Sequence, residues 1–413
     1  MTAARAAAEL LEEVALVRRR GGKPRPRQLW EMAQLALRWR MRPREYYLYR
    51  FHRRDRDYRD IVSYLPTRVL FHEILPAVND PSWVSLHDNK WLFHAHYSAL
   101  GLPLPEVYGL YEPSRGFDLE GEPLRTPEDL ERLLRRRRAP SVVIKPVGGT
   151  MGQGVLVIDA IDHRPDGLGL VGADGRRLTP SDLRALLAAD RQRTYRSDLR
   201  AWVAAEGGGG YGGFLVQEKV TQHPFLDELC PYTLNTIRVV TFAPAGGDVE
   251  LHFSVIRLGR AGNMVDGWLR GGVSVPVEAE SGRLGVGRLA PRHGDRDVEA
   301  HPDTGAPFTG LTLPDWEEVV ELCTAAARVT PGIRSAGWDV ALTPEGPLLM
   351  EGNPVWNLEM VQVHGPGYLQ PALRERLRPF GLSFPDRLPR ANRALWSDVR
   401  RSIQAARSRR AAR

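Results

Sequence analysis

The stretch that decides the fold is SVVIKPVGGTMGQGVLVI, residues 141–158. Its first apolar residues favour a strand that ends at Lys145, and a second strand is predicted at 155–158. The segment between them is rich in glycine, which tolerates positive φ and lets the backbone approach a ligand closely. Such a loop can turn several N–H groups toward one phosphate, and an adjacent lysine adds positive charge.

The order of these parts excludes two familiar phosphate-binding motifs. In a Walker loop the lysine follows the last glycine and a helix comes next, whereas here Lys145 precedes the glycines and a strand follows. A dinucleotide-binding loop also opens a helix, and none is readable after Gly154. The sequence therefore predicts a β-hairpin whose tip closes over phosphates. An ordinary glycine hairpin with a surface lysine is the alternative.

The composition is that of a globular protein with two or three domains. The chain has 413 residues, of which 42% are hydrophobic and 26% are charged. Two cysteines are too few for a disulfide framework. No apolar run approaches the ~20 residues that span a bilayer, and Glu12 and Glu13 interrupt the apolar N-terminal stretch. We expect a cytoplasmic protein without a membrane span.

The formal net charge is +7, with arginines concentrated at the chain ends and at Arg135–Arg138. Such runs can bind nucleic acid or anionic lipid. Solvated helix faces explain them more simply, because no interleaved aromatic stacking platform accompanies them. Nucleic acid is therefore not an expected partner. The oligomeric state is open, with a homodimer among the options.

Several helices can be placed from capping signals and apolar spacing. We expect a helical region at 1–80, with helices at 2–20 and 28–40. A helix at 88–100, with Asp88 as its N-cap, carries Lys90 near its start. Further helices are expected at 126–138, 180–189 and 313–327, the last with Cys323 packed in its apolar face.

The middle of the chain reads mainly as strands. Residues 214–220, 233–242 and 250–258 are expected to form strands. Residues 162–177 are read as a polar excursion, 207–213 as a flexible glycine tip and 263–276 as a glycine-bearing loop.

The second informative stretch is SAGWDVALTPEGPLLMEGNPVWNLE, residues 335–359. Two strands joined at Pro344–Gly346 place Asp339 and Glu351 opposite or within one position of each other. Asn353 lies two residues beyond Glu351, hence on the same strand face. Two carboxylates and an amide oxygen suit Mg²⁺, which shares its shell with phosphate oxygens and water. A pair of solvated strand-end acids is the alternative.

Together these segments resemble the ATP-grasp superfamily, over roughly residues 85–368. The resemblance rests on five segments in order: DNKWLFHAHYSALGLPLPEVYGLY, VVIKPVGGTMGQG, LVQEKV, TLNTIRVVT and GWDVALTPEGPLLMEGNP. The branch most similar to this chain is the sugar-transfer-associated one, which is akin to glutamate-ligase-like proteins. The segments that carry this similarity are NTIRVVTF, WLRGGVSV and EGNPVWNLEM. The helical extension and the arginine-rich tail after about Ala391 lie outside the match.

The resemblance implies a fold and a domain order. The fold class is α+β, an ATP-grasp fold with nucleotide held between two lobes and a helical N-terminal extension. The expected divisions are an extension at 1–80, an α/β subdomain at 81–139, a small lobe at 140–220, a large lobe at 221–390 and a basic tail at 391–413.

It also implies residue roles. ATP and Mg²⁺ are the implied cofactors, with Mn²⁺ as an acceptable substitute. Lys90 and Lys145 would contact the phosphates as point charges. Asp339, Glu351 and Asn353 match the metal ligands. The residues that would cover the phosphates are Gly148, Gly149, Thr150, Met151 and Gly152. The residues that would flank the adenine and ribose are Gln217, Glu218, Lys219, Val220, Asp227 and Glu228.

The implied chemistry is activation of a carboxylate by ATP. Arg238 matches the arginine beside the transferred phosphoryl group, where it neutralises developing charge. The residues expected on the acceptor side are Arg257, Asn263, Arg270, Gly271 and Gly272. The expected enzyme is a carboxylate–amine ligase for small-molecule or peptide substrates, acting through an acyl phosphate. A phosphotransferase and a non-catalytic nucleotide-binding partner of a glycan or natural-product pathway are the alternatives.

Overall fold

The computed structural model describes residues 22–148, 152, 154–165, 167–179, 182–183, 213–263, 266–290 and 296–390. The chain divides into two compact units. Unit 1 comprises Met1–Val78 and Asn357–Arg413, and unit 2 comprises Asn79–Trp356. In the described ranges, no helix combines the length and apolar character needed to cross a membrane. The boundaries expected at residues 80, 139, 220 and 390 stay predictions.

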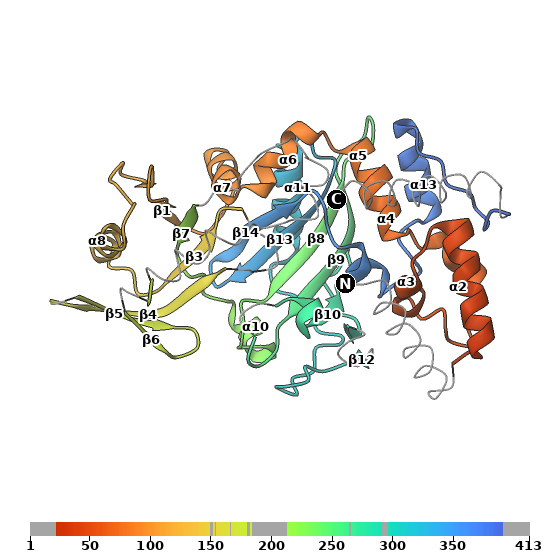
Figure 1. Cartoon of the computed structure of the whole chain (residues 1–413), viewed down its shortest axis with the longest axis horizontal. Helices are drawn as coiled ribbons and strands as arrows, with labels where there is room; N and C mark the ends of the chain where they lie inside the picture. The colour runs from red at the N-terminus through yellow and green to blue at the C-terminus, as the bar shows by residue number, and fades with distance from the viewer. Residues whose placement is uncertain are drawn as a thin grey trace, which may run out of the picture. The chain divides into compact units, whose positions relative to one another are not determined.

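Unit 1 is helical in its described part, as expected for residues up to 80 (Figure 1). Its aromatic and aliphatic core includes Leu35, Tyr46, Phe51 and Leu70, each fully buried. Its elements are α2 (Arg25–Trp39), α3 (Pro43–Leu48), η1 (Tyr58–Ser63), α4 (Thr67–Val69), η2 (Leu70–Ile74), α5 (Leu75–Val78), α12 (Leu358–Gln362), α13 (Pro371–Leu377) and η7 (Arg378–Phe380).

The small sheet of unit 2 has the strand order β2-β1-β7-β3-β4-β5-β6. Its strands are β1 (Val107–Tyr111), β2 (Phe117–Asp118), β3 (Val142–Pro146), β4 (Leu156–Arg164), β5 (Gly167–Gly172), β6 (Arg177–Leu178) and β7 (Phe214–Gln217). Strands β3 and β4 pair antiparallel, with Val142 opposite Ile158 and Ile144 opposite Leu156. The predicted hairpin around the glycine-rich loop is therefore confirmed.

The expected polar excursion at 162–177 is wrong. Strand β4 continues to Arg164 and pairs with β5, after which β6 completes a meander at one edge of the small sheet (Figure 1). Leu170 supplies apolar packing, since its side chain is buried in the core of this lobe. The glycines of GLGLVG resemble turn residues in the sequence, but the strand alternates them with apolar side chains.

The large sheet of unit 2 has the order β12-β11-β10-β9-β8-β13-β14. Its strands are β8 (Thr236–Phe242), β9 (Glu250–Leu258), β10 (Val273–Pro276), β11 (Gly287–Leu289), β12 (Asp297–Val298), β13 (Ser335–Thr343) and β14 (Gly346–Asn353). The strands expected near 233–242, 250–258 and 335–353 are confirmed. Strand β10 lies inside the expected loop at 263–276, where glycines precede a short apolar run; that part of the expectation is wrong.

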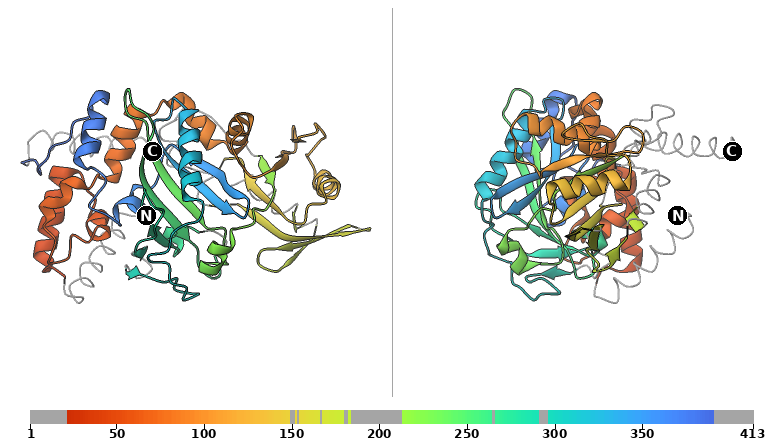
Figure 2. Two further views of the ribbon diagram at one scale, coloured as in Figure 1. Left: turned by 180° about the vertical axis from the view of Figure 1, so that it is seen from behind. Right: turned by 90° about the vertical axis from the view of Figure 1, so that its left-hand side faces the viewer.

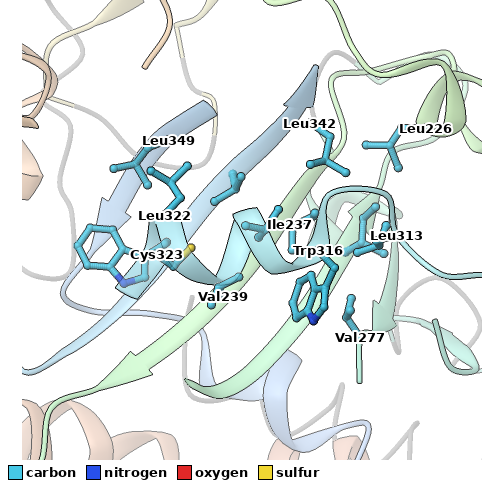
Figure 3. Packing of buried hydrophobic residues seen from close by; sticks show 14 of the residues in the cluster. Leu226, Ile237, Val239, Val277, Leu313, Trp316, Leu322, Cys323, Leu342 and Leu349 are labelled. Carbon is cyan, nitrogen blue, oxygen red and sulfur yellow. The ribbon is translucent and has the colours of Figure 1, made fainter. Parts of the chain in front are cut away.

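One face of the large sheet is covered by α11 (Trp316–Arg328), which the view from behind shows lying across the strands (Figure 2). Ile237, Val239 and Leu342 of the sheet join Trp316 and Cys323 of the helix in one buried cluster (Figure 3). Cys323 thus packs in the apolar face, as expected. The opposite face of the sheet is the one that carries the polar side chains described below.

Within the described part of unit 2 there are also the α-helices α6 (Pro81–Asp88), α7 (Lys90–Ala99), α8 (Pro127–Arg137) and α10 (Pro224–Leu229). The expected N-cap of α7, Asp88, is wrong, because Asp88 ends α6. The cap is Asn89, whose side-chain oxygen accepts from the backbone N–H groups of Trp91 (3.0 Å) and Leu92 (3.1 Å). Lys90 is therefore the first residue of the helix.

Four expectations concern residues that the structure describes only in part or not at all. The helix at 2–20 and the basic tail at 391–413 lie outside the described residues. So do most of the helix at 180–189 and most of the glycine tip at 207–213.

Candidate active site

Two lysines and a carboxylate come together where α7, β3 and β14 meet. Lys90 Nζ lies 3.9 Å from Glu351 Oε1, and the Lys90 backbone N–H donates to the Val147 carbonyl at 2.9 Å. Burial and the charge of Lys90 lower the pKa of Lys145 to about 8, while Glu351 opposes that shift. Lys145 and Glu351, 206 positions apart in the chain, therefore share one site.

The acidic strand pair has the predicted register. Asp339 of β13 lies opposite Glu351 of β14, and Gly337 lies opposite Asn353. Asn353 Nδ2 donates to the Gly337 carbonyl at 3.3 Å, which turns its amide oxygen the other way. Among the described residues, no three Asp, Glu, His or Cys side chains gather as a metal site. A metal here needs the amide oxygen as well as carboxylates, and that donor set fits Mg²⁺.

Asp339 is also the centre of a buried arginine clamp. Arg238 donates from Nε to Oδ1 (2.5 Å) and from Nη2 to Oδ2 (2.9 Å), while Arg257 Nη2 lies 3.0 Å from Oδ2. Burial alone would raise the pKa of this carboxyl, but the two guanidinium groups hold it below its usual value. The carboxylate is therefore ionised, and guanidinium groups engage both of its oxygens.

Sheet register explains why these side chains meet. Arg238 of β8 lies opposite Asp339, and Arg257 of β9 lies opposite Thr236 of β8. Thr236 and Arg238 are two apart on β8, so they project from the same face. That face is opposite the one that packs against α11.

Sequence reasoning missed Asp266, which completes this network. Asp266 Oδ2 accepts from the Thr236 backbone N–H (3.0 Å) and hydroxyl (2.5 Å), and it lies 3.3 Å from Arg257 Nε. Burial raises the pKa of Asp266, while Arg257 opposes the rise. In turn, Asp266 and Asp339 outweigh burial and raise the pKa of Arg257. Asp266 lies in an irregular loop, so no periodic pattern signalled it.

The loop that was expected on the acceptor side is anchored by polar contacts in its described part. Arg260 and Asp303 form a two-point ion pair at 2.6 and 2.7 Å, and Asn263 Nδ2 donates to the Arg270 carbonyl at 3.3 Å. A Cβ on Gly272 would lie 2.9 Å from the Asp266 carbonyl oxygen, so only glycine fits there without a shift. Gly271 has φ +106°.

Arg270 is placed differently from Arg238 and Arg257. Its side chain is exposed at the end of a short 3₁₀ turn, Trp268–Arg270. Among the described residues, no ion pair joins it to the Asp339 network. It therefore lies at the solvent side of the loop.

The expected adenine hinge follows β7. Gln217 is buried and paired on both sides, with Val107 and Val143. Glu218 exchanges two hydrogen bonds with Glu106, through its backbone N–H (2.9 Å) and its carboxylate (2.7 Å). Lys219 Nζ lies 2.9 Å from Asp159 Oδ1 of β4.

The remaining predicted residues are less closely placed. Val220 is buried, whereas Asp227 and Glu228 are exposed on α10, where Asp227 accepts from Gln222 Nε2 at 2.8 Å. Gly148 and Gly152 lie within the described residues, and Gly152 has φ +64°. The expected phosphate contacts from Gly149, Thr150 and Met151 lie outside them.

The arginine run at Arg135–Arg138 does not form an open basic patch. Arg135 pairs with Glu131 (3.1 Å), Arg136 with Asp118 and Glu120, and Arg137 with Glu106 and Glu120. These acids neutralise much of its charge. That pairing agrees with the simpler explanation, a solvated helix face.

Comparison with known proteins identifies a family. The model described as sugar-transfer associated ATP-grasp matches residues 70–378. No curated protein matches the chain.

Solved structures are similar at low identity. A D-alanine–D-alanine ligase from Coxiella burnetii is 9% identical, with 74% of this chain and 56% of that chain covered and a TM-score of 0.34. A biotin carboxylase from Campylobacter jejuni is 11% identical, with 77% and 52% covered and a TM-score of 0.39. An L-amino acid ligase from Bacillus licheniformis is 15% identical, with 65% and 43% covered and a TM-score of 0.33. The chain spans about half the length of the structures that it matches.

Proposed function

Because the chain belongs to the sugar-transfer-associated ATP-grasp family, and has the α+β ATP-grasp fold expected from its sequence, we propose that it is an ATP-dependent carboxylate–amine ligase. In this proposal a carboxylate oxygen attacks the γ-phosphorus of ATP, which breaks the bond to the β–γ bridging oxygen and releases ADP. An amine then attacks the acyl phosphate, loses a proton and displaces inorganic phosphate to form an amide. The substrates are small-molecule or peptide acids and amines. The observation that carries the proposal is the meeting of Lys145, Lys90 and Glu351 beside the Asp339 clamp.

In this proposal, some side chains of the site hold the nucleotide in position and others stabilise the charge that develops during phosphoryl transfer. Lys90 and Lys145 hold the phosphates, and the hinge at Gln217–Val220 receives the adenine. Arg238 and Arg257, fixed by Asp339, present guanidinium groups where charge develops on the transferred phosphoryl group. Asp339, Glu351 and Asn353 would hold Mg²⁺, which neutralises phosphate charge when bound.

The buried clamp supports this assignment in energetic terms. Removing two guanidinium groups and two carboxylates from water costs free energy, and the cost is offset only by close pairing. Arg238, Arg257, Asp339 and Asp266 balance one another in formal charge. A purely structural core would use apolar side chains here at lower cost. Pre-oriented charges that need no reorganisation are the main means of catalysis in phosphoryl transfer.

Product analysis tests the proposal. The full chain is incubated with ATP, Mg²⁺ and a pool of amino acids, peptides and sugar acids, and ADP and inorganic phosphate are quantified. A ligase releases the two in equal amounts and only with acceptors present. ADP without free phosphate, together with a stable phosphorylated product, would instead indicate a kinase. Absence of ADP release under every condition would contradict an enzymatic role.

A further inference from the structure

Unit 1 carries most of the positive charge of the chain. It holds 29 of the 57 lysines and arginines but only 13 of the 50 aspartates and glutamates, which gives a formal net charge of +16. The remaining 28 basic and 37 acidic residues give unit 2 a net charge of −9. A compact unit with this excess attracts anionic partners, and the formal net charge of +7 for the whole chain conceals it.

Helix α2 of unit 1 turns large apolar side chains outward (the red helix in Figure 1). Trp30 is 52% exposed and Leu29 is 44% exposed. At about 100° per residue, the outward arc is almost wholly apolar. We call this arc the α2 face; its members are Pro26, Leu29, Trp30, Ala33, Ala36 and Leu37. Solvated helices of water-soluble domains ordinarily place polar residues there.

The orientation of α2 is locked by a polar network on its inner side. Glu31 is fully buried and accepts from Lys23 Nζ (2.8 Å), Tyr46 Oη (2.7 Å) and Arg27 Nε (2.9 Å). Rotating the helix to bury Trp30 would expose Leu35 and break these charge-assisted bonds. The outward position of the α2 face is therefore built into the fold.

Arginines and an aromatic ring border the α2 face. Arg25 and Arg27 lie at its N-terminal edge, and both are exposed. Tyr58 packs edge-on against Trp30, with ring centroids 5.4 Å apart, and Arg59 follows it. Tryptophan and tyrosine favour the boundary between water and lipid, and arginine stems reach along it to phosphate groups.

We propose that unit 1 binds an anionic membrane surface, with the α2 face in the headgroup region and the surrounding arginines on lipid phosphates. This arrangement lies on the bilayer without crossing it. Charge alone would also suit a nucleic acid. The α2 face favours lipid over nucleic acid. Its apolar side chains gain free energy when they enter the headgroup region, and they provide no hydrogen-bonding groups that could read base edges. The inference does not depend on the proposed function.

Vesicle co-sedimentation of the full chain tests the inference. Vesicles of phosphatidylcholine with about 30% phosphatidylserine are compared with phosphatidylcholine alone. We expect binding to the anionic vesicles, weakened as NaCl rises from about 0.1 to about 0.5 M. Replacing Leu29 and Trp30 by glutamine should weaken it by about tenfold or more. The matched control is Leu119→Gln, since Leu119 of unit 2 is also exposed, at 53%; it should bind as the wild type does.

Each other outcome overturns the inference. Equal binding by the Leu29→Gln/Trp30→Gln variant would remove the α2 face from the interaction, and an unaffected Arg25→Glu variant would remove its arginine border. Binding of a duplex DNA oligomer without vesicle binding would identify a nucleic-acid surface. A lower melting temperature of the double variant, without vesicle binding by the wild type, would mean that protein covers the face. A wild-type dimer that the substitutions dissociate would identify a second copy as the occupant.

Discussion

At the scale of single residues, Lys145 and Glu351 carry the strongest expectation. In the proposed site, Lys145→Ala would remove a cation that contacts phosphate and Glu351→Ala would remove a metal ligand, so each should reduce ADP release by at least about a hundredfold. The fold should survive, because neither side chain packs in the apolar cores. Glu345→Ala, at the exposed turn of the same hairpin, is the matched control. Near-normal ADP release by either site variant, with a normal melting curve, would contradict the assigned site.

The lowered pKa of Lys145 predicts a pH dependence of nucleotide affinity. Its ammonium form dominates below about pH 8 and is lost above it. A bound phosphate requires the charged form, so binding at higher pH must take up a proton. The dissociation constant for ADP should therefore rise by about tenfold per pH unit above 8. Calorimetric titrations at several pH values measure this slope, and Lys145→Ala should lack it.

Asp266 is expected to position Arg257. Asp266→Asn removes the buried charge that faces Arg257 Nε and leaves Arg257 with Asp339 alone. Turnover should fall by about ten- to a hundredfold, the range for residues that orient site groups. The effect should vanish in an Arg257→Gln background, because the two residues act as one unit. Equal losses in both backgrounds would refute the coupling, and Asp248→Asn, in an exposed ion pair, is the control.

At the scale of secondary structure, the start of α7 links stability to the site. Asn89 caps the helix whose first residue is Lys90, so Asn89→Ala should cost about 1 kcal/mol of stability. Because Lys90 then loses its fixed position, ADP affinity should fall as well. Asn89→Ser keeps a capping oxygen and should restore both quantities. Thermal melting and ADP titration check this, and an unchanged melting temperature in Asn89→Ala would exclude the capping role.

The elements that sequence predicted well are those whose partners lie nearby in the chain. The hairpins at 142–158 and 335–353 follow from short turns, which fix register and so place Asp339 opposite Glu351. Strand β5 was missed because its glycines imitate a turn, and β10 was missed because Gly271 and Gly272 directly precede its short apolar run. Pairing with the long neighbouring strands β4 and β9 decides both structures.

The candidate site was only partly predictable from the sequence, because several of its contacts join residues that lie far apart in the chain. Lys145, Glu351 and Asn353 belong to recognisable motifs; the structure shows the expected hairpin register and brings Lys145 near Glu351, while the roles of the three residues stay predictions. The double clamp on Asp339 depends on the register among β8, β9 and β13, which sequence alone does not fix. Asp266 reaches that clamp from an irregular loop, so only the three-dimensional structure brings it to Arg257.

At the scale of the whole molecule, the candidate nucleotide site and the proposed membrane-binding surface belong to different units. Unit 2 contains both sheets and every described residue of the candidate site, whereas unit 1 holds the excess of arginine. The account therefore expects surface substitutions in the α2 face to change vesicle binding but not ADP affinity. It expects the reverse for Lys145 and Glu351.

Calorimetric titration of ADP into the full chain, with Mg²⁺ and with EDTA, tests the central claim most directly. That claim is that Lys90 of α7, Lys145 of β3 and the acids of β13 and β14 bind one magnesium nucleotide. The account predicts one ADP per chain, dependent on Mg²⁺, with affinity lost in both Lys145→Ala and Glu351→Ala. Magnesium-independent binding, or binding that either variant retains, would contradict it.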